Sequence, residues 1–203
     1  RYNSLAWRYL QDRGIAPQVA AGDAEILLAG KPDFLAINYY STATIAASRG
    51  DASDVSARAG DQQIMLGEPG VYRAADNPWV EKTPYGWVVD PVGLRLTLRK
   101  TWERYHLPIL ITENGMGAPD VLEEGDIIAD DYRIDFLRRH IEQMQLAIDD
   151  GVSLMGYCPW SAIDVVSTHQ GYGKRYGFIY VDRDEQDLNC LLYTSDAADE
   201  EDS

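Results

Sequence analysis

The stretch of sequence that decides the fold is P-I-L-I-T-E-N-G, residues 108–115. Residues 108–112 form a short apolar run of the kind that fills a buried strand. Glu113 and Asn114 follow it directly. A carboxylate at the tip of a buried strand needs a partner or a purpose, because an unpaired buried charge is costly. By itself, Glu113 fits a salt-bridged structural residue as well as a catalytic one.

Two further apolar runs, D-F-L-A-I-N-Y-Y at residues 33–40 and V-S-L-M-G-Y-C at residues 152–158, also predict buried strands. Helices are predicted between the strands. Residues 90–105 begin with Asp90 as N-cap and a proline at the first helical position, and residues 130–149 carry a helical period. This order predicts an α/β fold with a parallel sheet and right-handed crossovers.

The rest of the chain gives weaker signals. Short helices are predicted at residues 4–13 and 23–30, the second with Asp23 as N-cap. Residues 41–89 show no sustained period, which indicates a long functional loop or a mistaken assignment. The aromatic residues of this loop suggest that it folds over something; they are Tyr72, Trp79, Tyr85 and Trp87. The helix at 130–149 is expected to bury one apolar stripe, formed by Ile134, Leu137, Ile141, Met144 and Ile148.

Composition limits the class of partner. The 203 residues carry 33 Asp and Glu against 18 Lys and Arg, a net charge of −15, and 45% are hydrophobic, enough for a packed core. The acidic balance disfavours nucleic acid or an anionic membrane as partner, and no apolar run reaches the roughly 18 residues of a membrane span. Cys158 and Cys190 show no metal-binding spacing, so we expect free thiols, a reducing compartment and no metal.

Ligands of parallel sheets gather at the carboxyl ends of the strands, and this sequence places unusual residues there. They are Asn38, Tyr40, Glu113, Asn114, Trp160 and Ser161. Together with K-R-Y-G-F at residues 174–178, the motifs I-T-E-N-G, N-Y-Y and W-S resemble the C-terminal half of glycoside hydrolase family 1, the β-glucosidase-like retaining enzymes. The resemblance covers residues 2–188. It implies the C-terminal part of a (β/α)8 TIM barrel, about strands six to eight, incomplete in this chain.

The resemblance also implies roles for individual residues. Glu113 matches the family's nucleophile, which attacks the anomeric carbon and forms a glycosyl-enzyme. Tyr40 would hydrogen-bond Glu113 and orient it, and Asn38 would border the same subsite. Trp160 would cover the apolar face of the sugar ring. Trp87, on the long loop, would line the leaving-group side.

The stretch after the third strand concerns the substrate. Members of the family that act on plain glucosides read D-N-F-E-W after W-S, whereas Ser167 and Thr168 stand here in place of E-W. Ser167, Lys174 and Tyr176 match the spacing of the family's 6-phospho-glycosidases, where these residue types hold the phosphate. Arg175 is expected to add charge to this group. The resemblance therefore implies a 6-phospho-β-glucosidase with a small phosphorylated β-glycoside as partner and no cofactor.

Alternatives remain at this stage. One is a 6-phospho-β-galactosidase, which commonly carries Trp at the position of Thr168, and another is an unphosphorylated β-glucosidase. A sugar-binding or structural remnant without chemistry belongs to another class. The joint presence of Glu113, Tyr40 and Trp160 argues against the remnant.

The chain also departs from the family. The family's acid/base Glu lies in an N-E-P motif, which these 203 residues lack. We therefore expect residues 1–188 to form a partial glycosidase barrel that is inactive alone and, with open apolar sheet edges, prone to aggregate. Residues 189–203, with five acidic and no basic residues, are expected to be a disordered tail or non-gene sequence. A sugar-phosphate substrate implies a cytoplasmic location.

Overall fold

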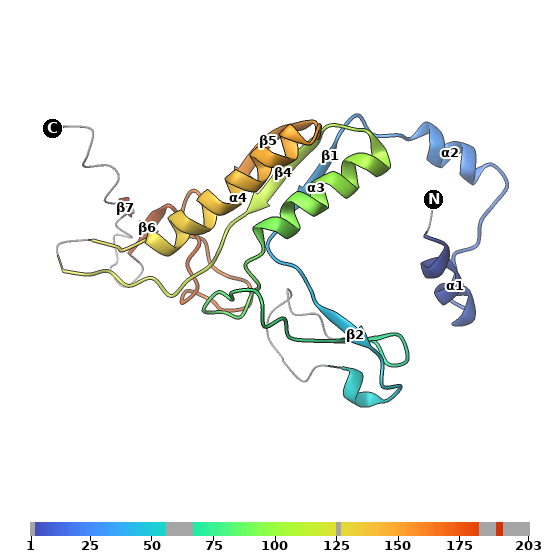
Figure 1. The fold of residues 1–203 in the computed structure, drawn as a ribbon, viewed down its shortest axis with the longest axis horizontal. Coiled ribbons are helices and arrows are strands. Elements are labelled where there is room, and N and C mark those ends of the chain that lie inside the picture. The colour runs from blue at the N-terminus through green and yellow to red at the C-terminus, as the bar shows by residue number, and fades with distance from the viewer. Residues whose placement is uncertain (1–2, 56–66, 125–126, 183–189, 193–203) are drawn as a thin grey trace. The chain divides into compact units, whose positions relative to one another are not determined.

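The computed structural model describes residues 3–55, 67–124, 127–182 and 190–192. The chain forms two compact units, residues 1–33 and residues 34–203 (Figure 1). The first unit contains helices α1 (Ser4–Asp12) and α2 (Asp23–Ala29), neither of which buries a side chain.

Both short helices were predicted, but Asp23 as the N-cap of α2 is wrong. Gly22 occupies the N-cap, with φ at 95°, and no side chain caps the helix. The Asp23 carboxylate instead accepts a hydrogen bond from the backbone N–H of Ala20, at 2.8 Å. A residue without Cβ fits this position because the left-handed conformation is open to glycine at little cost.

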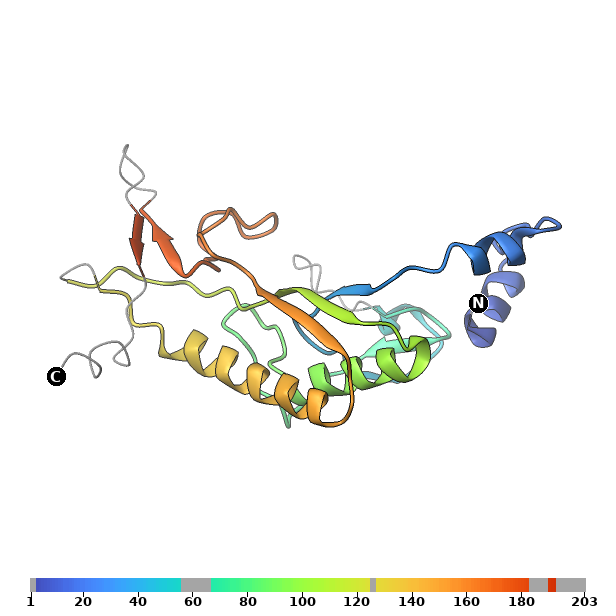
Figure 2. The ribbon, with the colours of Figure 1, turned by 90° about the horizontal axis from the view of Figure 1, so that it is seen from above.

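The second unit is built on a three-stranded parallel sheet in the order β1 (Leu35–Asn38), β4 (Ile109–Asn114), β5 (Leu154–Pro159). Helices α3 (Pro91–Tyr105) and α4 (Asp131–Asp149) lie together on one face of this sheet, as Figure 2 shows. The predicted parallel α/β arrangement is confirmed.

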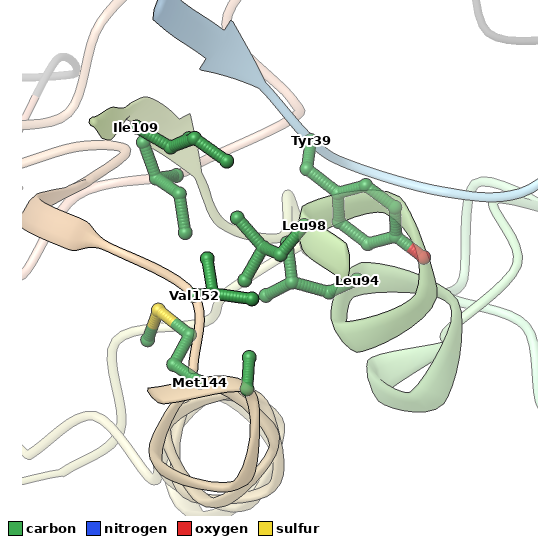
Figure 3. Close-up of a cluster of buried hydrophobic side chains, with 8 residues drawn as sticks. Tyr39, Leu94, Leu98, Ile109, Met144 and Val152 are labelled. Atoms are coloured by element: carbon green, nitrogen blue, oxygen red, sulfur yellow. The ribbon is translucent and has the colours of Figure 1, made fainter. Parts of the chain in front are cut away.

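The core lies between the sheet and these two helices (Figure 3). Every core side chain is at most 6% exposed, and the members are Tyr39, Leu94, Leu98, Ile109, Ile111, Met144, Ala147 and Val152. The predicted N-cap of α3 is confirmed, since the Asp90 carboxylate accepts from the backbone N–H of Gly93 at 2.8 Å. This cap and the core fix α3 against the sheet.

The predicted apolar stripe of α4 is largely wrong. Ile134, Ile141 and Ile148 are 39, 50 and 45% exposed. The face turned inward carries two polar side chains along with apolar ones, namely Arg133, Phe136, His140, Met144 and Ala147. The polar members are tolerated because they have partners: Arg133 pairs with Asp120 and Asp130, and His140 Nδ1 lies 2.7 Å from the Phe136 carbonyl oxygen.

Residues 41–89 contain more regular structure than predicted. β2 (Ile45–Ala47) pairs antiparallel with β3 (Tyr72–Ala74), and the short 3₁₀ helix η1 (Ala52–Asp54) lies between them in the chain. Strands of three residues are too short to give a readable period, which explains why this antiparallel pair was not predicted. Trp79 is 91% exposed and covers nothing among the described residues.

Near the end of the described chain, β6 (Ile179–Val181) pairs antiparallel with β7 (Cys190–Leu192). The strand β7 lies beyond the predicted boundary at residue 188. Residues 183–189 and 193–203 fall outside the described part, so the boundary and the nature of the tail stay predictions. No helix among the described residues is long and apolar enough to cross a membrane.

Candidate active site

A cavity of about 190 Å³ opens where β1, β4 and β5 end. The strand ends contribute Tyr40, Glu113 and Trp160, and two loops close the remaining walls. The complete lining is Tyr40, Trp87, Glu113, Trp160, Val165, Val166, Ser167, Thr168, His169, Lys174 and Tyr176. The fold thus brings together residues from distant parts of the chain, from Tyr40 to Tyr176.

Eight of the residues given a role from the sequence line this cavity, namely Tyr40, Trp87, Glu113, Trp160, Ser167, Thr168, Lys174 and Tyr176, whereas Asn38, Asn114, Ser161 and Arg175 do not. Asn38 has an exposed side chain that accepts a hydrogen bond from the Thr112 hydroxyl at 2.6 Å. Val165, Val166 and His169 line the cavity without having been predicted. No sequence signal distinguished them, because their part in the wall depends on the path of the loop.

Glu113 and Tyr40 are in direct contact in the cavity wall. The Tyr40 hydroxyl donates a hydrogen bond to Glu113 Oε2 at 2.7 Å. Burial, and then the Glu113 carboxylate, raise the pKa of Tyr40 above its usual range. The phenol therefore stays protonated and remains a donor to Glu113.

Asn114 is a structural residue of the site that sequence reasoning left without a role. Its side chain is fully buried. Its amide donates to the Tyr39 carbonyl oxygen at 2.8 Å, and its Oδ1 accepts from the Tyr157 hydroxyl at 3.0 Å. Asn114 thereby joins the ends of three strands beside Glu113. In the sequence, the only indication of this role is that a polar residue follows an apolar strand.

Gly115 explains how the end of β5 approaches the end of β4 so closely. A Cβ at this position would lie 1.9 Å from the Trp160 carbonyl oxygen. The Trp160 N–H also donates to the Asn114 carbonyl oxygen at 2.7 Å. The glycine therefore permits the contact that sets Trp160 next to Glu113 in the cavity wall.

Lys174 is 1% exposed and enclosed by aromatic rings. Its ammonium lies 3.7 Å from the centroid of the Trp87 ring, 4.9 Å from that of Tyr85 and 5.3 Å from that of Tyr176. The Tyr85 hydroxyl donates to the Gly173 carbonyl oxygen at 2.8 Å, which ties the two loops together. Ring faces stabilise a cation once it is removed from water. The predicted loop aromatics Tyr85 and Trp87 thus fold over a lysine.

Arg175 does not add its charge to this group. Its guanidinium donates to the buried Asp164 carboxylate at 2.8 Å and to the Val181 carbonyl oxygen at 2.8 Å. It also lies 3.9 Å from the centroid of the Tyr180 ring. The expectation that Arg175 assists Lys174 is wrong, because alternate residues of this extended segment point to opposite sides.

The lining therefore offers a carboxylate, an ammonium, hydroxyls and an indole face. Within the described residues, no group of three or more His, Cys, Asp and Glu side chains is arranged to hold a metal ion. Such an arrangement suits a substrate with an electrophilic carbon at Glu113, an apolar face at Trp160 and an anionic group near Lys174.

Comparison with known proteins gives a family and a set of relatives. A model of glycosyl hydrolase family 1 matches residues 1–196. Aryl-phospho-β-D-glucosidase BglC of Bacillus subtilis is 44% identical over 94% of this chain, and the 6-phospho-β-glucosidase of Dickeya chrysanthemi is 39% identical over 91%. The 6-phospho-β-galactosidase of Leptotrichia buccalis is 36% identical over 87%.

The chain matches less than half of the length of each of these relatives. The chain spans 40% of BglC and 37% of the Dickeya enzyme. Among solved structures, the family 1 β-glucosidase from Thermotoga maritima aligns with 95% of this chain and 38% of its own, at a TM-score of 0.77 and 29% identity. The prediction of a partial (β/α)8 barrel is confirmed by this likeness.

Proposed function

Because the chain belongs to glycosyl hydrolase family 1, we propose that it supplies the nucleophile and the phosphate-binding side of a retaining 6-phospho-β-glucosidase. The observation that carries the proposal is one cavity containing Glu113, held by Tyr40, together with the buried Lys174 and Ser167. The printed names of the relatives, aryl-phospho-β-D-glucosidase and 6-phospho-β-glucosidase, support the same substrate class.

In this proposal Glu113 attacks the anomeric carbon while the leaving-group oxygen takes a proton from a second carboxylic acid. Water then releases the sugar from the glycosyl-enzyme with retained configuration. Trp160 covers the sugar ring, and Trp87 lines the leaving-group side. Asn38 contributes at the edge of the subsite through its contact with Thr112.

The phosphate is proposed to bind Ser167, Lys174 and Tyr176. A hydroxyl, an ammonium and a phenol offer donors and a positive charge, whereas a glutamate at position 167 would repel the anion. Thr168, which lines the cavity, leaves room for a gluco configuration. The residue at 168 is also what distinguishes the second candidate, a 6-phospho-β-galactosidase, a name that one relative carries.

The 203 residues contain no N-E-P motif, so we propose that they are inactive without a second carboxylate from elsewhere. Two carboxylates are sufficient for retaining hydrolysis, and the proposal needs no cofactor. We also propose a cytoplasmic location, because the proposed substrate is a phosphorylated sugar.

The test uses the full-length protein that carries this segment. Its kcat/KM is measured on p-nitrophenyl β-glucoside, β-glucoside 6-phosphate and β-galactoside 6-phosphate. We expect the gluco 6-phosphate substrate to be fastest, and faster turnover of the unphosphorylated glucoside would contradict the phosphate assignment. Thr168→Trp is expected to shift preference toward the galacto substrate.

Trapping tests the nucleophile separately. A 2-deoxy-2-fluoro-β-glucoside 6-phosphate is expected to leave a covalent adduct on Glu113, found by peptide mass spectrometry. Glu113→Gln keeps the size of the side chain and should abolish both the adduct and turnover. An adduct on another residue, or full labelling of the Gln variant, would disprove the role given to Glu113.

A further inference from the structure

Gly117 follows the proposed nucleophile Glu113 in the loop after β4 and is buried against Lys174. A Cβ built at this glycine would lie 2.6 Å from both Cγ and Cε of Lys174, and 3.0 Å from Cε1 of Tyr176. Carbon atoms in contact normally stand about 3.5–4.0 Å apart. Any side chain at position 117 must therefore displace the lysine stem.

The stem of Lys174 is closely confined by its neighbours, and the open space beside it is the cavity itself. Lys174 is 1% exposed, and its ammonium is 3.7 Å from the Trp87 ring centroid on the cavity side. Cγ belongs to the inner part of the stem, so rotation of the outermost bonds cannot relieve the clash there. Displacement of the stem would carry the ammonium with it.

The backbone around Gly117 is equally constrained. The Ala118 N–H donates to the Arg175 carbonyl oxygen and the Arg175 N–H donates to the Ala118 carbonyl oxygen, both at 2.9 Å. These two bonds fix the chain next to Gly117 against the chain next to Lys174. The two segments cannot separate to admit a methyl group without losing them.

We propose that Gly117 is a specificity-determining position of this site. By having no side chain, it positions the Lys174 ammonium for the phosphate of the substrate. The inference rests on the proposed function and adds a residue that acts through Lys174 without touching the substrate. A side chain at 117 should weaken recognition of the phosphate while leaving the chemistry at Glu113 intact.

The experiment compares Gly117→Ala with Gly173→Ala in the full-length protein. Gly173 is next to Lys174 in sequence, but a Cβ there has no neighbour closer than the Gln170 carbonyl oxygen at 3.9 Å, and its φ is not positive. KM and kcat are measured on p-nitrophenyl β-glucoside with and without the 6-phosphate. Inhibition by inorganic phosphate gives an independent measure of the anion site.

For Gly117→Ala we expect KM for the phosphorylated substrate and the inhibition constant of phosphate to rise about tenfold, which corresponds to about 1.4 kcal/mol. KM for the unphosphorylated glucoside should change by less than about twofold, and Gly173→Ala should leave all three values unchanged. An equal rise of KM for both substrates, or no rise at all, overturns the inference.

A double-mutant cycle keeps the inference testable even where Gly117→Ala folds poorly. Lys174→Ala removes the stem that the methyl group would strike, so adding Gly117→Ala to it should cause no further rise of either constant. A further rise would mean that position 117 acts through something other than Lys174. If the unaltered protein does not prefer the phosphorylated substrate, the proposed function fails; if it does and the cycle is additive, only the role of Gly117 fails.

Discussion

The two helix pairs of the chain, α1 with α2 and α3 with α4, carry similar apolar side chains and bury them to opposite extents. Ile26, Leu27 and Leu28 of α2 are 70, 75 and 80% exposed, whereas Leu94 and Leu98 of α3 are fully buried. The difference lies in the neighbours, because α3 and α4 cover a sheet. Helices gain most of their stability from packing a face rather than from their own propensity.

The largest expected effect tests this difference directly. Leu98→Ala removes a fully buried side chain from the core and should lower the free energy of unfolding by about 2–5 kcal/mol. Leu27→Ala makes the same chemical change in α2 and should cost at most about 0.5 kcal/mol. Urea unfolding of the chain at low concentration, followed by tryptophan fluorescence, measures both. Equal costs would show that the two helix pairs do not differ in packing.

A pH dependence of stability is expected from α4, which carries the buried His140. Burial lowers the pKa of His140 from 6.5 to about 4, with a smaller effect of Arg139 in the same direction and opposing effects of the Phe136 carbonyl and Asp90. The unfolded chain therefore takes up the proton first, and stability is lost as the pH falls from about 6.5 to about 4. Above about pH 6.5 the contribution is fully present.

The size of this loss should be on the order of 3 kcal/mol at most. It is read from unfolding midpoints recorded between pH 7 and pH 4. His140→Gln cannot be protonated in this range and should show a clearly smaller slope. The same slope in the variant would assign the pH effect to other groups.

The N-terminal cap of α3 should contribute more to the free energy of unfolding than that of α2. Asp90 accepts hydrogen bonds from the Gly93 N–H and the Thr42 hydroxyl, both at 2.8 Å, whereas no side chain caps α2. Asp90→Ala is expected to cost about 1 kcal/mol, within the usual range for an N-cap. Asp23→Ala is the matched change in α2 and should cost less. Thermal unfolding of the two variants measures both costs. A larger loss for Asp23→Ala than for Asp90→Ala would contradict the comparison.

The smallest effect concerns the ends of the same two helices. The C-cap of α3 is His106 with φ at 49°, a left-handed conformation that glycine adopts at little cost, while the C-cap of α2 is Gly30 with φ at −79°. His106→Gly should stabilise the chain by about 0.5 kcal/mol, part of the gain being offset by loss of the edge contact with Trp102. Gly30→Ala should be nearly neutral in the same melting experiment. A lower melting temperature for His106→Gly would show that the ring contact outweighs backbone strain.

Local signals in the sequence were sufficient for the main elements of the sheet unit. Apolar runs predicted β1, β4 and β5, and the Asp90-Pro91 start predicted α3. Both signals depend only on residues that are adjacent in the sequence. The buried face of α4 was predicted wrongly because it contains Arg133 and His140. Arg133 is paired with Asp120, outside the helix, and His140 contacts the backbone carbonyl of Phe136. Periodicity counts such residues as exposed.

The site divides in the same way. The sequence by itself determined which residues were candidates, since Glu113, Tyr40, Trp160, Ser167, Lys174 and Tyr176 stand in recognisable motifs. Only the tertiary structure decided their arrangement: Tyr40 bonded to Glu113, Lys174 enclosed by rings, Arg175 paired with Asp164, and Gly117 pressed against the lysine stem. A sequence motif shows which types of side chain are present. The contacts between loops depend on strand register and close packing, because these bring together residues that are far apart in the chain.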